Sequence, residues 1–138
     1  MTKKSPFKFK ENLMLETSDY EDVKNMLVDH ESTIARINYH QNLESHFHTM
    51  LIAMKNNHAV QIHKHQDKDE FLYVLEGSLR VTFYNDQREK MGNEKILKNG
   101  NGILILKNTW HEIQAESDFC LFLENAPGPF RPDQTSYL

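Results

Sequence analysis

The sequence has few of the residues that mark unusual classes of protein. Its 138 residues include one cysteine, four prolines and five glycines, which excludes collagen-like, mucin-like and disulfide-rich chains. The single cysteine, Cys120, cannot form an internal disulfide. We interpret it as a small buried hydrophobic side chain, because it lies in the apolar run of residues 119–123. The length corresponds to about one domain.

Long hydrophobic runs are also absent from the sequence. The longest uncharged apolar runs, such as residues 102–106 and 119–123, are far shorter than the ~20 residues that a membrane span requires. The first twelve residues are rich in charge and contain no apolar region of the kind found in signal peptides. From these absences and the lone thiol we expect a cytoplasmic protein with no membrane partner.

The charge is nearly balanced, with 16 basic and 20 acidic residues and a formal net charge of −4. Because a phosphate backbone attracts an excess of positive charge, we expect no nucleic-acid partner. Histidine is the residue type that stands out. There are eight histidines, and several of them lie between His40 and His65.

The pattern of apolar residues predicts one short helix followed by strands. Ser18–Glu21 has the form of a capping box, and apolar residues follow it at helical spacing up to Leu27. From Ile34 onward, short apolar or alternating runs separated by turn residues predict an all-β sandwich or barrel. The predicted strands are residues 34–39, 47–54, 59–65, 70–75, 78–84, 103–106, 110–115 and 119–124.

We therefore expect three parts: an N-terminal extension with a short helix (1–33), a barrel (34–125) and a proline-rich C-terminal arm (126–138). The arm holds three of the four prolines, which a central strand does not accept. Two interpretations of the arm stay open. It is either a tail on the barrel surface, or a lid over a site or a contact with a second subunit.

Four residues have the spacing of metal ligands. His63 and His65 alternate along one strand, so their side chains share a face with Cα atoms about 6.5 Å apart. Residues 66–69 reverse the chain and bring the carboxylate of Glu70 beside them. His111 follows a second strand and turn and is a candidate third imidazole. Three imidazoles and one carboxylate suit one divalent transition metal (Fe, Mn, Ni, Co or Zn) rather than Mg or Ca.

These residues carry a family resemblance. The pattern His-x-His-x4-Glu-x6-Gly at His63, His65, Glu70 and Gly77 resembles the first cupin motif, and residues 100–111 resemble the second. The resemblance implies a double-stranded β-barrel (jelly roll) in which these two histidines, the glutamate and His111 bind one divalent metal ion.

Three positions depart from the cupin pattern without touching the ligands. Asn57 and Asn108 stand where glycine is usual, and Leu106 stands where proline is usual. Asparagine tolerates the left-handed backbone conformation that turns require.

Further segments narrow the resemblance. Residues 36–40, 108–111 and 123–130 are similar to those of the WbuC-like cupins found in bacterial surface-polysaccharide gene clusters. This likeness implies a homodimer and a carbohydrate or sugar-nucleotide substrate.

Other polar and aromatic residues are candidates for a site around the metal. A strand before the barrel places Arg36 and His40 at its mouth. Arg36 suits a substrate carboxylate or phosphate through bidentate hydrogen bonds, although an ordinary surface arginine is an equally good interpretation. His40 is a candidate for proton transfer. We expect Phe83 to line the cavity and contact substrate, together with Leu72 and Val74.

The remaining candidates have plainer interpretations. Asp69 adjoins Glu70, but we expect it at the rim because Glu70 keeps the correct spacing to the glycine. His46 and His48 also share a strand face, yet no carboxylate follows at the required distance, so we interpret them as packed or solvated. His30 and His58 are interpreted as surface residues.

The leading functional hypothesis is a metal-dependent isomerase or epimerase that acts on a carbohydrate, with the metal as Lewis acid. The carbohydrate is implied by the resemblance alone. Two alternatives stay open, because one fold hosts many functions: an Fe(II)-dependent dioxygenase of a small metabolite, and a cupin that binds a small ligand without catalysis.

Overall fold

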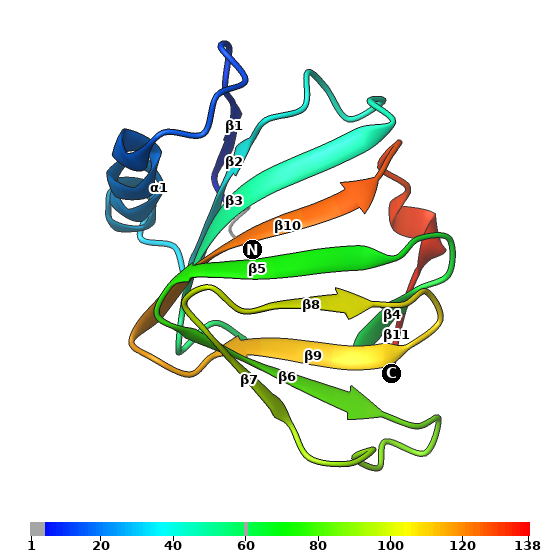
Figure 1. Ribbon diagram of the computed structural model, residues 1–138. Coiled ribbons are helices and arrows are strands. Elements are labelled where there is room, and N and C mark those ends of the chain that lie inside the picture. Colours follow the sequence, from blue (N-terminus) through cyan, green and yellow to red (C-terminus); the bar gives the residue numbers. More distant parts are fainter. Residues whose placement is uncertain (1–4, 60) are drawn as a thin grey trace.

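Two β-sheets and one α-helix form the part of the chain that the computed structural model describes, residues 5–59 and 61–138. The strands of the six-stranded sheet lie in the order β1-β2-β3-β10-β5-β8, and those of the five-stranded sheet in the order β11-β4-β9-β6-β7. The two sheets face each other, and the helix lies outside them (Figure 1). The prediction of an all-β fold with one short N-terminal helix is confirmed.

The strand bounds are as follows. The larger sheet contains β1 (Phe7–Phe9), β2 (Ile34–Asn38), β3 (Phe47–Lys55), β10 (Phe119–Pro127), β5 (Glu70–Glu76) and β8 (Gly102–Ile105). The smaller sheet contains β11 (Thr135–Tyr137), β4 (His63–His65), β9 (Trp110–Ala115), β6 (Ser78–Tyr84) and β7 (Lys95–Lys98).

Each predicted strand has a counterpart, but some bounds differ. The predicted strand 59–65 is present as the three residues of β4, and residue 60 lies outside the described residues. Strands β1, β7 and β11 were not predicted, because runs of three or four residues carry too little periodicity to stand out. Gly77, between β5 and β6, has a φ of +79°. This conformation is one that glycine adopts without strain, so the predicted turn there is explained.

Helix α1 (Thr17–Asp29) is present as predicted, but it starts earlier than the predicted capping box. Asp19 Oδ2 accepts the backbone N–H of Glu16 at 3.1 Å, so the cap precedes Ser18 and Ser18 lies inside the helix. Val23 and Leu27 are buried against the outer face of the larger sheet, in a cluster that includes Ile37, Leu51 and Leu121. The helix therefore covers that face.

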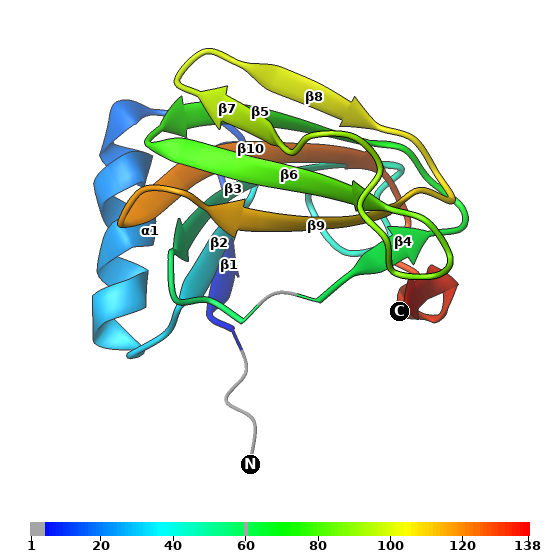
Figure 2. The same ribbon diagram turned by 90° about the horizontal axis from the view of Figure 1, so that it is seen from below.

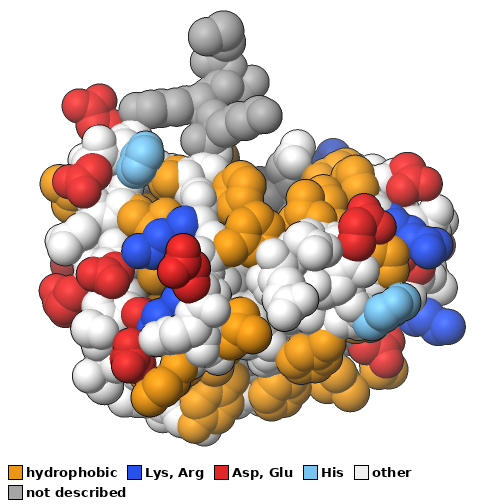
Figure 3. Space-filling model, turned by 90° about the horizontal axis from the view of Figure 1, so that it is seen from above, with side chains coloured by type: hydrophobic (Ala, Val, Ile, Leu, Met, Phe, Trp, Pro, Cys, Tyr) orange, Lys and Arg blue, Asp and Glu red, His pale blue; other side chains and the backbone are white. Residues whose placement is uncertain are grey.

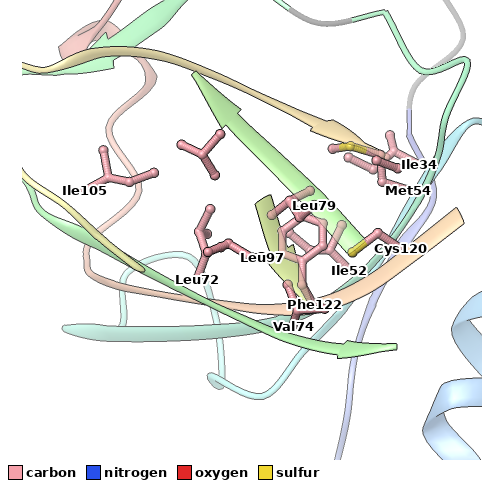
Figure 4. Close-up of a cluster of buried hydrophobic side chains, with 12 residues drawn as sticks. Ile34, Ile52, Met54, Leu72, Val74, Leu79, Leu97, Ile105, Cys120 and Phe122 are labelled. Atoms are coloured by element: carbon pink, nitrogen blue, oxygen red, sulfur yellow. The ribbon is translucent and has the colours of Figure 1, made fainter. Parts of the chain in front are cut away.

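A second apolar cluster fills the space between the sheets (Figure 4). Phe122 belongs to this inner cluster and Leu121 to the outer one, because successive side chains of a strand point to opposite faces. Both faces of the first part of β10 are therefore buried, which explains the apolar run of residues 119–123. Cys120 is fully buried in the inner cluster, as expected.

Residues of the C-terminal arm pair with strands of both sheets. Strand β10 continues to Pro127, which pairs with Phe47, so it extends two residues into the predicted arm. A 3-10 turn (Pro132–Gln134) leads to β11, which pairs with β4. Figure 2 shows this end of the chain beside β4.

The surface mixes apolar and charged groups (Figure 3). Phe7, Leu13, Met14 and Val28, all in or near the N-terminal segment and α1, are among the exposed apolar side chains. None of the helices in the described residues has the length and apolar content needed to span a membrane.

Candidate metal centre

The structure brings the four predicted metal ligands together. His63 and His65 come from β4, Glu70 is the first residue of β5, and His111 is the second residue of β9. One potential ligand atom from each side chain lies within 4.8 Å of the others. His63 and His111 are direct partners across the β4–β9 pair. The four side chains can hold a single divalent metal ion, whose identity the donor set leaves open.

Hydrogen bonds fix the orientation of all three imidazoles. His63 Nδ1 lies 3.0 Å from the carbonyl oxygen of Gln61, and His111 Nδ1 lies 2.8 Å from that of Thr109. A carbonyl oxygen only accepts, so Nδ1 of both rings carries a proton and Nε2 of the neutral ring is free to bind a metal. His65 Nδ1 lies 3.0 Å from the hydroxyl of Thr135.

The Nε2 atoms face the carboxylate of Glu70. His65 Nε2 lies 3.0 Å and His111 Nε2 lies 3.6 Å from Glu70 Oε1. In a neutral ring protonated on Nδ1, Nε2 has a lone pair that repels a carboxylate oxygen. A cation between these atoms, either a proton or a metal ion, removes the repulsion. The nitrogen and oxygen donors are the set that divalent transition metals prefer, so the site fits such an ion.

Burial and neighbouring charges shift the pKa values in the expected directions for a metal site. Burial, and then the proximity of His111, lower the pKa of His63, which keeps the ring neutral. Burial alone would raise the pKa of Glu70, but the adjacent rings of His111 and then His65 hold it well below its ordinary value. Neutral imidazole and ionised carboxylate are the forms that bind metals.

A fifth titratable side chain, Glu124 of β10, adjoins the cluster. Burial, and then the negative charge of Glu70, raise the pKa of Glu124 well above its ordinary value, so it keeps a proton and hydrogen-bonds with Glu70. Through this bond Glu124 helps to orient Glu70. Sequence reasoning did not assign it a role. The sequence does contain an indication of this role, because Glu124 is a carboxylate at an inward position of an otherwise apolar strand.

A cavity of about 560 Å³ adjoins the cluster. His63, His65, Glu70 and Glu124 lie in its wall. Its volume is in the range of small-molecule sites, and much of its lining is apolar. The apolar lining includes Ile34, Met50, Ile52, Met54, Ile113 and Phe122.

The other predicted site residues divide into two groups. Arg36 and His40 line the cavity, and their predicted roles toward a substrate stay predictions. Phe83 is not among the described residues that line it. Phe83 pairs with His111 across β6 and β9 and packs against the inner core cluster. Its contact with a substrate stays a prediction. Leu72 and Val74 likewise belong to the core.

His48 occupies a more specific place than its interpretation as a packed or solvated residue suggested. It is 6% exposed, lines the cavity and stacks on His40 with ring centroids 3.8 Å apart and an angle of 10° between the planes. His46 is exposed, and so is His30. The alternation of β3 could have indicated that His48 points inward, because it shares a face with Met50 and Ile52.

Three residues near the motifs, Asp69, Asn108 and Trp110, lie outside the metal cluster. Asp69 is exposed and accepts the backbone N–H of Lys107 at 2.8 Å, outside the metal cluster. Asn108, in the place of the usual glycine, has a φ of +61°. Trp110 points away to Asp86, whose Oδ1 accepts its ring N–H at 2.7 Å.

Comparisons with known proteins support the fold. A family model described as a domain of unknown function (DUF6016) matches residues 31–96. No curated protein matches the chain.

Several solved structures are similar. Oxalate decarboxylase from Bacillus subtilis is 22% identical, with a TM-score of 0.56 over 70% of this chain and 25% of that one. KdgF from Halomonas sp. is 20% identical, with a TM-score of 0.57 over 73% of this chain and 83% of that one. A transcriptional regulator of the HTH_3 family from Vibrio cholerae is 17% identical, with a TM-score of 0.54 over 71% and 52% of the two chains.

Oxalate decarboxylase and KdgF are cupin-fold proteins, and the present chain shares their fold. The chain spans only about a quarter of the length of the oxalate decarboxylase. The fold and the cluster together define a cupin-fold protein with a candidate site for one divalent metal ion. The narrower likeness to the WbuC-like cupins stays a prediction.

Proposed function

We propose that the protein is a metal-dependent enzyme of the isomerase or epimerase type that acts on a carbohydrate or sugar derivative in bacterial surface-polysaccharide biosynthesis. The observation that carries the metal-dependent part is the convergence of three imidazoles on Glu70 at the wall of the cavity. The carbohydrate and the polysaccharide link rest on the resemblance to the WbuC-like cupins, which also underlies a proposed homodimer in the cytoplasm.

Each residue of the site has a role in this proposal. His63, His65, Glu70 and His111 would hold the metal, which would act as a Lewis acid on a carbonyl or hydroxyl oxygen. Arg36 lines the cavity and has no ion-pair partner within 4.0 Å among the described residues, so its guanidinium is available to an anionic group of the substrate.

His40 is the proposed proton-transfer residue. Its Nδ1 accepts the backbone N–H of Thr49 at 3.2 Å, so the neutral ring carries its proton on Nε2. Burial, and then the proximity of His48, lower the pKa of His40.

Elemental analysis tests the metal site. Protein purified without added metal should contain about one transition-metal ion per chain, and His63→Ala and His111→Ala should lower that content at least about tenfold. His30→Ala is the matched control, because His30 is exposed and lies outside the cluster. Equal metal content in all four proteins would contradict the ligand assignment.

A thermal-shift screen tests the substrate class. Sugar nucleotides and keto sugars should raise the Tm of the metal-loaded protein by mass action. If no member of the panel raises it, the carbohydrate part of the proposal is wrong.

The same ligand set also suits an Fe(II) dioxygenase, because three imidazoles and one carboxylate leave open positions on a six-coordinate metal. Iron in the purified protein together with substrate-dependent oxygen uptake would favour that reaction. Tight ligand binding without turnover would instead favour a non-enzymatic binding protein.

A further inference from the structure

The cavity lies where the two sheets end on one side of the molecule. Strand β1 is the last strand of the larger sheet, next to β2, and β11 is the last strand of the smaller sheet, next to β4. Figure 2 shows β1, β2 and β4 along one side, opposite β8. Residues of β1, β2, β4 and β11 all line the cavity. Its mouth therefore has two lips, one formed by β1 and β2 and the other by β4 and β11.

Each lip carries an exposed aromatic side chain. Phe7 of β1 is 53% exposed and Tyr137 of β11 is 63% exposed, and both line the cavity. Single exposed apolar residues are common on protein surfaces, but these two border the same cavity from different sheets. A ligand that enters between the lips therefore meets an accessible aromatic ring on each of them.

Strand pairing connects the second lip to the metal centre. Tyr137 is the direct partner of His63 across β11 and β4, so their side chains share one face of the smaller sheet. The centroids of the two rings lie 6.2 Å apart. A molecule in contact with the Tyr137 ring therefore lies next to the metal cluster.

Strand pairing also connects the first lip to a positive charge. Phe7 is the partner of Arg36 across the parallel strands β1 and β2, so the two side chains share a face. Both line the cavity. Arg36 is only partly buried, so its guanidinium remains accessible to a ligand. An aromatic ring and a guanidinium thus lie side by side at this lip.

The loop between β4 and β5 adds a second positive charge. Lys68 lines the cavity, is partly buried and has no ion-pair partner within 4.0 Å among residues 5–59 and 61–138. The acidic lining residues are Glu70 and Glu124, so a divalent ion in the cluster would leave the lining with a net positive charge. Such a cavity favours an anionic ligand, although the chain as a whole has a net charge of −4.

The aromatic lips and the two cations together favour one class of ligand. A neutral sugar would leave both cations without a partner, and an aliphatic anion would leave both aromatic rings without one. A nucleotide satisfies all of these groups, because its phosphates pair with arginine and lysine side chains and its base stacks on aromatic rings. A sugar attached to the phosphates would then extend toward the metal centre.

We propose that Phe7 and Tyr137 form a stacking subsite for the base of a nucleotide at the cavity mouth, and that Arg36 and Lys68 bind its phosphate groups. The inference deepens the proposed function, on which it rests for the sugar at the metal centre, and identifies the substrate as a nucleotide-linked sugar rather than a free sugar. Arg36 keeps the role proposed above, whereas Phe7, Tyr137 and Lys68 acquire one.

Five small molecules separate the base from the phosphate. UMP and AMP carry both groups, ribose 5-phosphate lacks the base, and uridine and adenosine lack the phosphate. In calorimetric titration we expect at least one nucleotide to bind about tenfold more tightly than ribose 5-phosphate, which is the gain that one stacked base provides, and more tightly than its own nucleoside. Affinities of both nucleotides no higher than that of ribose 5-phosphate, or no binding of either nucleotide, would overturn the proposal.

Variants at the lips locate the stacking. Phe7→Ala and Tyr137→Ala should each weaken nucleotide binding about fivefold or more and leave the binding of ribose 5-phosphate unchanged. Phe47→Ala is the matched control, because Phe47 is 65% exposed and is not among the described residues that line the cavity. Unchanged nucleotide affinity in both lip variants would contradict the base subsite.

A charge variant tests the phosphate contact. Lys68→Gln should weaken the binding of the nucleotide and of ribose 5-phosphate by the same factor, because both carry the phosphate, and should leave the affinity for the nucleoside unchanged. Lys95→Gln is the control, because Lys95 is exposed on β7 and is not among the lining residues. Equal nucleotide affinities of Lys68→Gln and Lys95→Gln would contradict the assignment of Lys68.

The NMR spectrum of the bound nucleotide provides a readout in the unaltered protein. Base protons that lie over the ring of Phe7 or Tyr137 should shift upfield through the ring current, and the shift should decrease in the corresponding alanine variant. Base protons with the same shifts in the free and bound nucleotide would overturn the stacking.

The His111→Ala variant separates this proposal from the function proposed above. Nucleotide binding with the same upfield shifts in this metal-depleted variant supports the subsite, even if the metal-dependent reaction is absent. Conversely, a metal-dependent enzyme that converts a free sugar and does not bind nucleotides would retain the proposed function and overturn the subsite.

Discussion

The hydroxyl of Thr135 lies 3.0 Å from Nδ1 of His65, a residue 70 positions earlier in the chain. The contact exists because β11 pairs with β4, with Thr135 directly opposite His65. The C-terminal arm therefore supports the metal centre through one of its imidazoles. This favours a structural role at the site over a tail that only lies on the surface.

Replacing Thr135 by valine should weaken metal binding by about tenfold, because the hydrogen bond that orients His65 is lost while the side-chain shape is kept. The affinity is measured by competition with a chromophoric chelator. Thr135→Ser retains the hydroxyl and should bind metal like the wild type. Equal affinities of the valine and serine variants would show that the hydroxyl does not orient the ligand.

Removing the metal should destabilise the protein, because the cluster links β4, β5 and β9 in the folded state only. At a free metal concentration 100 times Kd, binding contributes about 2.7 kcal/mol. The Tm in scanning calorimetry should fall when a chelator is added and recover with excess metal. His63→Ala should show neither change. A chelator effect of the same size in that variant would contradict the prediction.

Asp19 should contribute to stability at neutral pH and lose that contribution in acid. Burial alone would raise the pKa of Asp19, but hydrogen bonds from Lys10 and Tyr39 lower it below its ordinary 3.8. Because the pKa is lower in the folded state, the stabilisation is present above about pH 4 and disappears as the pH falls through the folded-state pKa.

The substitution Asp19→Asn should therefore lower the unfolding free energy at pH 7 by on the order of 1 kcal/mol, with a smaller effect at pH 3. Urea titrations at the two pH values measure this difference. Asp22→Asn is the control, because the Lys8–Asp22 pair is half exposed, with 4.0 Å between the charged groups. An effect of Asp19→Asn that is independent of pH would contradict the assignment.

Cys120 should not react in the folded protein. Burial raises the pKa of its thiol to about 12, so at pH 8 the folded protein has about a thousandfold less thiolate than a thiol with a pKa of 9. Iodoacetamide should label Cys120 in denaturant and not in buffer. Since the folded-state pKa is the higher one, this group stabilises the fold fully below pH 9 and loses that effect as the pH rises toward 12.

A cysteine at an exposed position, Asn93→Cys, provides the control for the labelling reaction. It should react in the folded protein while Cys120 stays protected. Labelling of both thiols at similar rates without denaturant would show that the inner core opens under native conditions.

Local patterns in the sequence were sufficient for the metal cluster and for the described strands other than β1, β7 and β11. Alternation placed His63 and His65 on one face, and the turn residues after His65 brought Glu70 back beside them. The helix was also predicted, but its start was not, because Asp19 caps Glu16 rather than serving a box that begins at Ser18. Either assignment satisfies the local pattern, and the tertiary contacts of Asp19 with Lys10 and Tyr39 decide between them.

The sequence by itself determined the fold class and the residues of the metal cluster, because strand alternation and ligand spacing are properties of short segments. Only the tertiary structure decided which distant groups surround that cluster. Thr135 reaches His65, Glu124 reaches Glu70, and His40 stacks on His48 through pairings between strands far apart in the chain. Such contacts depend on sheet order and register, which the packing of the whole core selects and no single segment encodes.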